Sequence, residues 1–223
     1  MKNTLPCIRQ FFLTLFFASL FYQVSYAEPY NLGLAKQMLI QYHDSGAYQQ
    51  ELTRAIDRAH QLILQQAKHY RKGQKLAIVL DIDETSLSNY KYLLQRDFSN
   101  NPKQVHQEIL KADAPAILPM RALYNDAIKH GIHVFFITGR TEDERTATIK
   151  NLHKAGYRNW SGLYLKSNAQ KTLPALRYKT QKRAEITRKG YIIIASIGDQ
   201  VSDIEGGYTQ MGFKLPNPFY YLS

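Results

Sequence analysis

Short aliphatic runs alternate with amphipathic segments from about residue 75 onward. The apolar runs cover residues 76–80, 132–137, 163–165 and 191–197, and they suit strands that are buried on both faces of a sheet. The segments between them have helical character, stop at a glycine, and cover residues 119–130, 142–155 and 172–189. Strands and helices that alternate through short connections predict an α/β fold with a doubly wound, Rossmann-type parallel sheet.

Two other regions complete the predicted elements. Residues 52–67 have strong helical periodicity, and residues 32–42 have a weaker one, so two helices are expected before the first strand. Residues 86–116 look like an insertion rather than part of the sheet, with a short helix that begins at Asn101-Pro102. We therefore predict a single domain over residues 28–223 with a small helical cap insertion that overhangs the first strand.

Acidic residues directly follow the first predicted strand. Asp81 and Asp83 lie at its carboxyl end, which is where ligands bind in open α/β sheets. Because strand side chains alternate, both carboxylates can point into one crevice while Ile82 points away. Two carboxylates this close repel each other unless a cation or a shared proton lies between them. A polar strand end followed by a turn would explain the same residues, so at this point both interpretations stay open.

Polar residues also follow two other predicted strands. These strand ends carry Thr138-Gly139-Arg140 and Gly198-Asp199, with Asp203 shortly after. Asp81, the backbone carbonyl of Asp83 and Asp199 would supply hard oxygen ligands, which suit Mg²⁺ better than a soft transition metal. Thr138 and the amides after it could hold phosphate oxygens at the start of a helix. These residue types therefore favour binding of a phosphoryl group, together with a metal ion, at this edge of the sheet.

A positive side chain is needed to balance a phosphoryl group. The predicted helix 172–189 offers Arg177, Lys179, Lys182 and Arg183. Lys179 lies early enough in the helix to point toward the strand ends, but the physical argument alone does not choose among the four.

Four short motifs occur in order along the chain: DIDET at 81–85, ITGR at 137–140, YKTQKR at 178–183 and GDQVSD at 198–203. Together they resemble the motifs of the haloacid dehalogenase (HAD) superfamily, specifically its class B/C acid phosphatase branch, subfamily IIIB, which includes plant vegetative storage proteins. The resemblance runs from about Leu76 to Gly207 and extends to APAILP, LYLKSN and the Asn89-Tyr90 pair after the first motif. Any one of the motifs is weak evidence, whereas the four together are highly specific.

The resemblance implies a Mg²⁺-dependent acid phosphatase that hydrolyses phosphomonoesters through an aspartyl-phosphate intermediate. By the same resemblance, Asp81 would be the nucleophile and Asp83 the acid/base. The roles that it implies for the remaining site residues are metal binding by Asp81, Asp83 and Asp199, phosphate binding by Thr138, Gly139 and Lys179, and support of the metal shell or the lysine by Asp203. It thus selects Lys179 from the four basic residues of the helix.

Aromatic residues of the insertion bear on the substrate. Tyr90, Tyr92 and Phe98 could stack on a flat group, which makes a nucleoside monophosphate a reasonable substrate, with sugar phosphates as the alternative. Aromatic residues at this density more often form the small core of the insertion itself, and we favour that interpretation for each of them.

The amino terminus has the layout of a secretory signal peptide over residues 1–27. Lys2 and Arg9 precede an apolar stretch from Phe11 to Tyr22, and small residues precede a cleavage point after Ala27. The alternative is a membrane anchor, but spanning a bilayer takes about 20 apolar residues. A lipoprotein signal would need a cysteine just after the apolar core, whereas the only cysteine, Cys7, lies before it. We therefore predict a periplasmic or secreted protein without a membrane anchor after cleavage.

Composition adds little beyond a positive charge. The hydrophobic fraction is 44% and the charged fraction 21%, as in ordinary globular proteins. The net charge of +11 counts Lys2 and Arg9, so it would be +9 after cleavage, and it fits an anionic partner. A nucleic-acid binder is one alternative function, but the basic run 166–189 is better interpreted as a solvated helix face. A non-catalytic storage or binding protein on the same fold is the other alternative.

Overall fold

A parallel sheet forms the centre of the computed structural model, which describes residues 28–71 and 73–222. The elements given below belong to one compact unit that begins at Leu32. Its strands are β1 Lys75–Leu80, β2 His133–Thr141, β3 Gly162–Lys166, β4 Tyr191–Gly198 and β5 Met211–Lys214. They are parallel and lie in the order β3-β2-β1-β4-β5. The predicted α/β class and parallel sheet are confirmed, and β5 is an additional strand that the sequence pattern did not predict.

The strand order changes direction at β1. The chain leaves β1 toward β2 and β3 on one side, and returns to β4 on the other side of β1. In open α/β sheets, such a switch point leaves a crevice at the carboxyl ends of the strands. Asp81 directly follows β1, and Asp199 directly follows β4. The topology therefore brings residues that are 118 positions apart to the two sides of one crevice.

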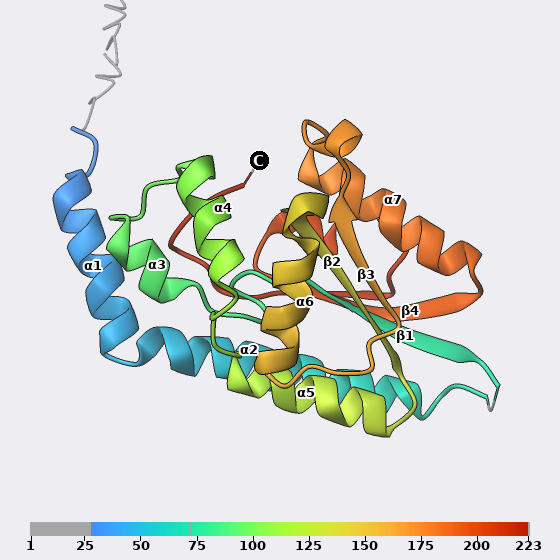
Figure 1. Ribbon diagram of the computed structural model, residues 1–223. Coiled ribbons are helices and arrows are strands. Elements are labelled where there is room, and N and C mark those ends of the chain that lie inside the picture. Colours follow the sequence, from blue (N-terminus) through green and yellow to red (C-terminus); the bar gives the residue numbers. More distant parts are fainter. Residues whose placement is uncertain (1–27, 72, 223) are drawn as a thin grey trace, which may run out of the picture. The chain divides into compact units, whose positions relative to one another are not determined.

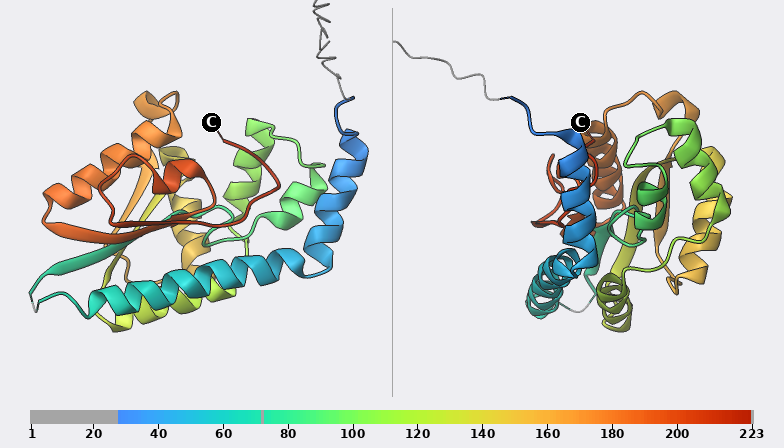
Figure 2. Two further views of the ribbon diagram at one scale, coloured as in Figure 1. Left: turned by 180° about the vertical axis from the view of Figure 1, so that it is seen from behind. Right: turned by 90° about the vertical axis from the view of Figure 1, so that its left-hand side faces the viewer.

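Helices cover both faces of the sheet. The larger ones are α1 Leu32–Asp44, α2 Ala47–Ala67, α5 Leu118–Lys129, α6 Arg145–Lys154 and α7 Ala175–Arg188, and shorter turns lie at η1 Glu142–Glu144, η2 Asn168–Gln170 and α8 Val201–Ile204. Figure 1 shows α2 and α5 side by side on one face of the sheet and α7 on the other. The two further views in Figure 2 also show helices on both sides of the central sheet. This is the three-layer arrangement of a doubly wound fold.

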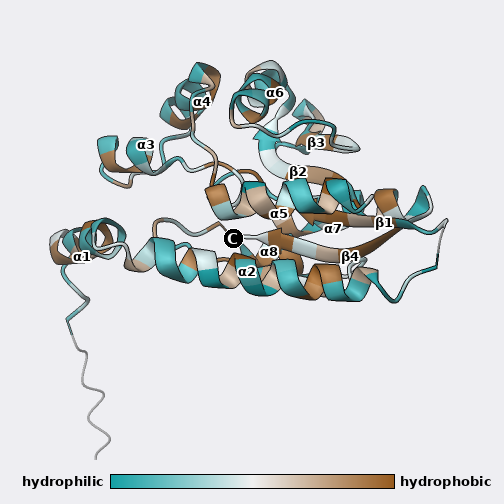
Figure 3. Ribbon diagram, turned by 90° about the horizontal axis from the view of Figure 1, so that it is seen from below, coloured by the Kyte–Doolittle hydropathy of each residue, from teal (hydrophilic) through white to brown (hydrophobic). Residues whose placement is uncertain are grey.

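The core has two parts because strand side chains alternate between the faces. Ile78 and Leu80 of β1 belong to the larger cluster, which includes the buried residues of α2 and α5. Ala77 and Val79 belong to a smaller cluster under α7. Figure 3 shows the strands as mainly hydrophobic and α2 as alternately hydrophobic and hydrophilic along its length. The amphipathic patterns of the sequence therefore correspond to faces that pack against the sheet.

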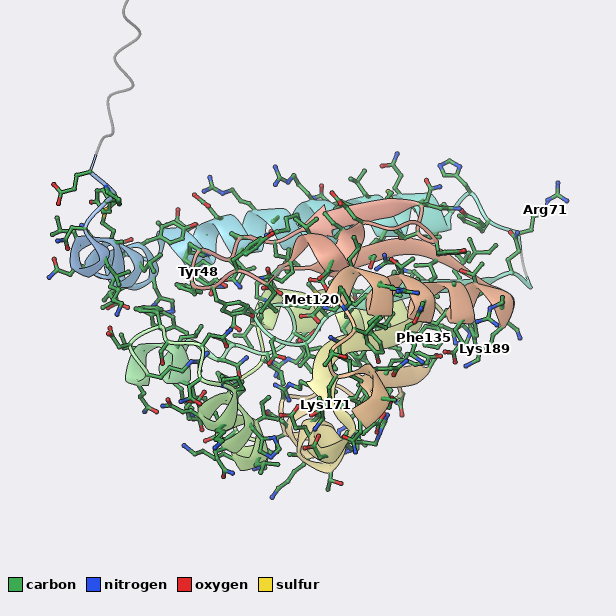
Figure 4. The ribbon with its side chains drawn as sticks, turned by 90° about the horizontal axis from the view of Figure 1, so that it is seen from above. Tyr48, Arg71, Met120, Phe135, Lys171 and Lys189 are labelled. Atoms are coloured by element: carbon green, nitrogen blue, oxygen red, sulfur yellow. The ribbon has the colours of Figure 1, made fainter. Side chains whose placement is uncertain are left out.

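Side-chain placement follows the same layering. In Figure 4, Met120 and Phe135 lie among the packed elements, whereas Arg71 and Lys189 lie at the margin. Met120 and Phe135 are buried, and Arg71 and Lys189 are exposed.

The segment 86–116 contains two helices, α3 Tyr90–Gln95 and α4 Pro102–Lys111. The sequence pattern predicted α4 but not α3. Asn101 begins α4 by accepting hydrogen bonds from the amides of Lys103 (3.1 Å) and Gln104 (3.4 Å), and Pro102 occupies the first turn. This capping geometry explains why Asn101-Pro102 correctly marked the start of a helix in the sequence.

The predicted signal peptide, residues 1–27, lies outside the described residues and stays a prediction. Within residues 28–71 and 73–222, no helix combines the length and apolar character needed to cross a membrane.

Candidate active site

Asp81 and Lys179 form the centre of the site. The backbone amide of Asp81 continues the sheet by donating to the carbonyl of Ile197 (3.0 Å), and this fixes the residue at the end of β1. Its Oδ1 accepts a hydrogen bond from Nζ of Lys179 (2.7 Å), and the same ammonium donates to Oδ1 of Asp203. All three side chains are less than 10% exposed. Burial alone would lower the pKa of Lys179, but the carboxylates of Asp203 and Asp81 raise it overall, so the lysine is charged.

The loop after β4 places Asp199 and Asp203. The amide of Gln200 donates to Oδ2 of Asp203 (2.8 Å), which turns the chain into α8 and directs the Asp203 side chain back over β4. A Cβ atom at Gly198 would lie 2.2 Å from the Asp203 carboxyl carbon, so only glycine fits where the strand ends. The GDQVSD motif therefore serves packing as well as chemistry.

Three buried carboxylates come together at this point. One oxygen from each of Asp81, Asp199 and Asp203 lies within 4.8 Å of the others. Burial raises the pKa of Asp81 and of Asp199, and the charge of Asp203 raises both further. Lys179 is a single ammonium among three carboxylates, so a cation is needed to keep all of them ionised. The donor set, hard oxygens only, fits a divalent ion such as Mg²⁺. The family resemblance implied a supporting role for Asp203, whereas the geometry groups its carboxylate with those of Asp81 and Asp199.

Asp83 is held apart from this cluster by Arg140. The guanidinium of Arg140 donates to both carboxylate oxygens of Asp83, from Nη2 at 2.6 Å and from Nε at 3.0 Å. Nδ2 of Asn89 adds a hydrogen bond of 2.8 Å. Burial alone would raise the pKa of Asp83, but the charge and hydrogen bonds of Arg140 bring it below its ordinary value. Without a ligand, Asp83 is therefore an ionised, oriented carboxylate that remains 27% exposed.

Glu84 follows in a strained backbone conformation. Its φ of 52° lies in the left-handed region, which a residue with a side chain rarely adopts and which is common near functional sites. The side chain is buried and accepts hydrogen bonds from the Asn89 amide (2.6 Å) and the Tyr220 hydroxyl (3.1 Å). Burial, with the charge of Asp83, raises the pKa of Glu84 to about 8.

The two residues predicted to bind phosphate at the end of β2 occupy different positions. Thr138 is fully buried, and its hydroxyl accepts a hydrogen bond from the Arg140 amide (3.2 Å). Gly139 is exposed and lines the cavity described below, with no atom within 4 Å of the position a Cβ would take. The backbone at Gly139 is thus open to a ligand.

The structure also separates Lys179 from the other basic residues of α7. Arg183 is fully buried, and its guanidinium donates to backbone carbonyls of α8 and the loop after it, including those of Asp203 (3.0 Å) and Gly207 (2.9 Å). Lys182 pairs with Glu185 at the surface (3.1 Å), and Arg177 is exposed. Lys179 alone among these four lines the cavity.

A cavity of about 710 Å³ opens above the carboxylates. Its lining includes Asp81, Asp83, Gly139, Lys179 and Asp199 on the side of the sheet and Phe98, Val105 and His106 on the side of the insertion. Tyr90 and Tyr92 are 8% and 3% exposed, and Tyr90 belongs to the large core cluster of the domain rather than to a separate core of the insertion. Phe98 is half-buried, packs against the same cluster and reaches the cavity. The space is far larger than one phosphate group and leaves room for the organic part of an ester.

Several residues that shape the site carried no role in the sequence analysis. Arg140 was named in a strand-end motif, and Asn89 belongs to a polar turn after DIDET, but nothing in the spacing pairs either with Asp83. Asn217 and Tyr220 come from the segment after β5 and contact Asp199 and Glu84. Such contacts join loops far apart in sequence, so no local periodicity signals them.

The fold and the site define an α/β protein with an acidic, lysine-bridged cluster at the switch point of its sheet. Residues 27–223 match the profile of the HAD superfamily, subfamily IIIB (acid phosphatase). The chain belongs to this family, which confirms the resemblance that the four motifs carry.

The names of the similar proteins include a stem glycoprotein, an acid phosphatase and vegetative storage proteins. The stem 28 kDa glycoprotein of Glycine max is 37% identical over 71% of this chain and 66% of its own length. Acid phosphatase 1 of Solanum lycopersicum is 34% identical over 65% and 58%, and vegetative storage protein 1 of Arabidopsis thaliana is 30% identical over 70% and 62%. The chain thus spans less than two thirds of the length of these relatives.

A solved structure has the same fold. The class C acid phosphatase from Bacillus anthracis superposes with a TM-score of 0.69 over 84% of this chain and 86% of that one, at 22% identity. A second structure of that enzyme, with tungstate bound, has a TM-score of 0.67.

Proposed function

We propose that the protein is a Mg²⁺-dependent acid phosphatase that hydrolyses phosphomonoesters through an aspartyl-phosphate on Asp81. The observation that carries the proposal is the buried ammonium of Lys179 between Asp81 and Asp203, with Asp199 in the same cluster and a cavity above it. A carboxylate at a cavity floor, beside a fixed positive charge, is suited to attack a phosphoryl group. Family membership supports the same chemistry.

The metal would be held by the carboxylates of Asp81 and Asp199 and the backbone carbonyl of Asp83, with Asp203 beside them. A bound divalent cation supplies positive charge that neutralises phosphate oxygens. In the resting site, Lys179 already supplies one such charge on the side of Asp81 and Asp203.

In the first step, the Asp81 carboxylate forms a bond to phosphorus while the bond from phosphorus to the ester oxygen breaks. Asp83 donates its proton to the leaving alkoxide. In the second step, Asp83 takes a proton from water, and the resulting hydroxide releases phosphate from Asp81. Lys179 and the backbone near Gly139 hold the phosphate oxygens in both steps, which is where electrostatic stabilisation is largest.

The pairing with Arg140 controls the protonation of Asp83. The pKa of Asp83 is low while both of its oxygens are paired with Arg140. The negative charge of an incoming phosphoryl group would raise that pKa, and an acidic medium would add to the effect. An acidic optimum, as the family name suggests, is consistent with this requirement.

The substrate we propose is a small phosphomonoester with a bulky organic group. Phe98, which lines the cavity, offers a face for a flat group such as a nucleobase, and sugar phosphates are the alternative. The tungstate complex of the Bacillus anthracis enzyme supports an oxyanion as the shared part of the ligand.

A metal-removal assay tests the proposed function. The purified protein is expected to hydrolyse a chromogenic phosphate ester. EDTA should lower the rate of hydrolysis by about tenfold or more, and added Mg²⁺ should restore it. Hydrolysis that is indifferent to EDTA would contradict the metal dependence.

A storage or binding protein is the second candidate, because two relatives are named vegetative storage proteins. The complete set of Asp81, Asp83, Lys179 and Asp199 argues against it, since storage has no physical need for them. A folded protein with no activity on a panel of phosphomonoesters would favour this candidate.

We also propose that residues 1–27 are a cleaved signal peptide and that the protein is periplasmic or secreted. The names of the stem glycoproteins among the relatives are consistent with a secreted protein. Sequencing the amino terminus of the exported protein tests the cleavage point after Ala27.

A further inference from the structure

The segment Leu215–Leu222, which follows β5, returns from the sheet to the region of α3 and α4. Figure 1 and the left view of Figure 2 show this red segment along its whole course. Two apolar anchors fix it. Leu215 is fully buried and its amide donates to the carbonyl of Gly198 (2.8 Å), and the ring of Phe219 packs edge-on against Tyr48 with centroids 4.9 Å apart.

Between these anchors, Asn217 points its amide group at the acidic cluster. Nδ2 of Asn217 donates to Oδ2 of Asp199 (2.6 Å), while its Oδ1 accepts from the amide of Phe219 (2.9 Å). The second bond forms a turn and fixes the orientation of the side chain. Gln200 donates to the same oxygen of Asp199 (2.6 Å), and Thr85 donates to the other (3.2 Å). Asp199 is thus held at both oxygens.

Tyr220 extends the contact toward Asp83. Its hydroxyl donates to Oε2 of Glu84 (3.1 Å), and Oε1 of Glu84 accepts from the backbone amide of Asn89 (2.6 Å). The side-chain amide of Asn89 then donates to Oδ1 of Asp83 (2.8 Å). Tyr220 and Leu222 also line the cavity.

We infer that the segment Leu215–Leu222 is a positioning element of the active site, in which Asn217 holds the carboxylate of Asp199 in place. This inference rests on the proposed function. Leu215 and Phe219 already anchor the segment, so the bond from Asn217 to Asp199 is not needed for its attachment. The partners that orient a ligating carboxylate determine the affinity for the metal. Through Glu84 and Asn89, Tyr220 acts on Asp83 in the same indirect way.

Asn217→Ser separates the positioning role from the turn. A serine hydroxyl can still accept from the Phe219 amide, but it is too short to reach Asp199. We expect the variant to need about tenfold more Mg²⁺ for half-maximal activity. It should also show a smaller rise in Tm on addition of Mg²⁺, while its Tm with EDTA stays near that of the wild type. The Tm readout reports metal binding without turnover.

Asn125→Ser is the matched control, because Asn125 is an exposed amide on α5. It should leave the Mg²⁺ dependence and the Tm rise unchanged. Wild-type values of both quantities in Asn217→Ser would overturn the inference while leaving the phosphatase proposal intact. A wild-type protein that Mg²⁺ neither activates nor stabilises would overturn both.

Tyr220→Phe and Tyr221→Phe form a second pair. Tyr220 donates to Glu84, whereas Tyr221 is 78% exposed. Loss of one neutral hydrogen bond predicts a kcat lower by about 2- to 10-fold in Tyr220→Phe, with the Mg²⁺ dependence unchanged. Tyr221→Phe should match the wild type. Equal kcat values in the two variants would remove Tyr220 from the positioning element.

Discussion

Asp81→Asn is expected to abolish phosphatase activity, with a fall in kcat of about 10⁴-fold or more. The amide cannot attack phosphorus, and no neighbouring carboxylate can take its place. Asp83 is paired with Arg140, and Asp199 is held by Asn217, Gln200 and Thr85. The measurement is steady-state hydrolysis of a chromogenic ester at saturating Mg²⁺.

The fold of Asp81→Asn should be intact. The substitution is close to isosteric, and it removes one of three buried negative charges around a single ammonium. We therefore expect a Tm equal to or above that of the wild type. Asp57→Asn, at an exposed position of α2, is the matched control and should keep full activity. Wild-type turnover in purified Asp81→Asn protein would refute the assignment of the nucleophile.

Lys179→Met is expected to lose both activity and stability. The methionine preserves the apolar stem but removes the ammonium that joins Asp81 to Asp203. Breaking a buried ion pair from one side costs about 3–5 kcal/mol in the free energy of unfolding. Loss of a preorganised charge that faces the phosphoryl group should lower kcat by about 10²- to 10³-fold.

The stability loss should depend on pH. Burial raises the pKa of Asp81, and loss of the ammonium that opposes this effect would raise it further above the value in the unfolded protein, so the folded state binds more protons. Stability of the variant therefore falls as pH rises, and the deficit should be smaller near about pH 5 than near about pH 7.5. Lys182→Met is the control, because Lys182 pairs with Glu185 at the surface and should change stability by less than about 0.5 kcal/mol. Equal denaturation curves for Lys179→Met and the wild type would contradict the buried bridge.

Much of the fold was predictable because the signals are local. Continuous aliphatic runs mark β1, β2 and β4, and a glycine follows the ends of α5, α6 and α7. The strand β5, Met211–Lys214, was not predicted because it has only four residues and includes Gly212. The helix α3, Tyr90–Gln95, has only six residues and lacks a side-chain cap.

The acidic residues of the candidate site were predictable for the same reason, since each follows a buried strand. The choice of Lys179 was not, on physical grounds alone. Lys179 and Arg183 lie four residues apart on one buried face of α7. Only the folded structure shows that the Arg183 guanidinium donates its hydrogen bonds to backbone carbonyls of α8 and the loop after it. The contact between Asn217 and Asp199 likewise depends on where β5 leaves the sheet.

The central claim is a covalent phosphoryl group on Asp81, and Asp83→Asn offers the most direct test. With a nitrophenyl ester the leaving group needs little protonation, so Asp81 can still attack, but the asparagine cannot activate water for the second step. Turnover should therefore stop after the first release of chromophore. Mass spectrometry of the acid-quenched protein should then find one phosphoryl group on Asp81. Chromophore release in one equivalent with Asp81 unmodified would contradict the account.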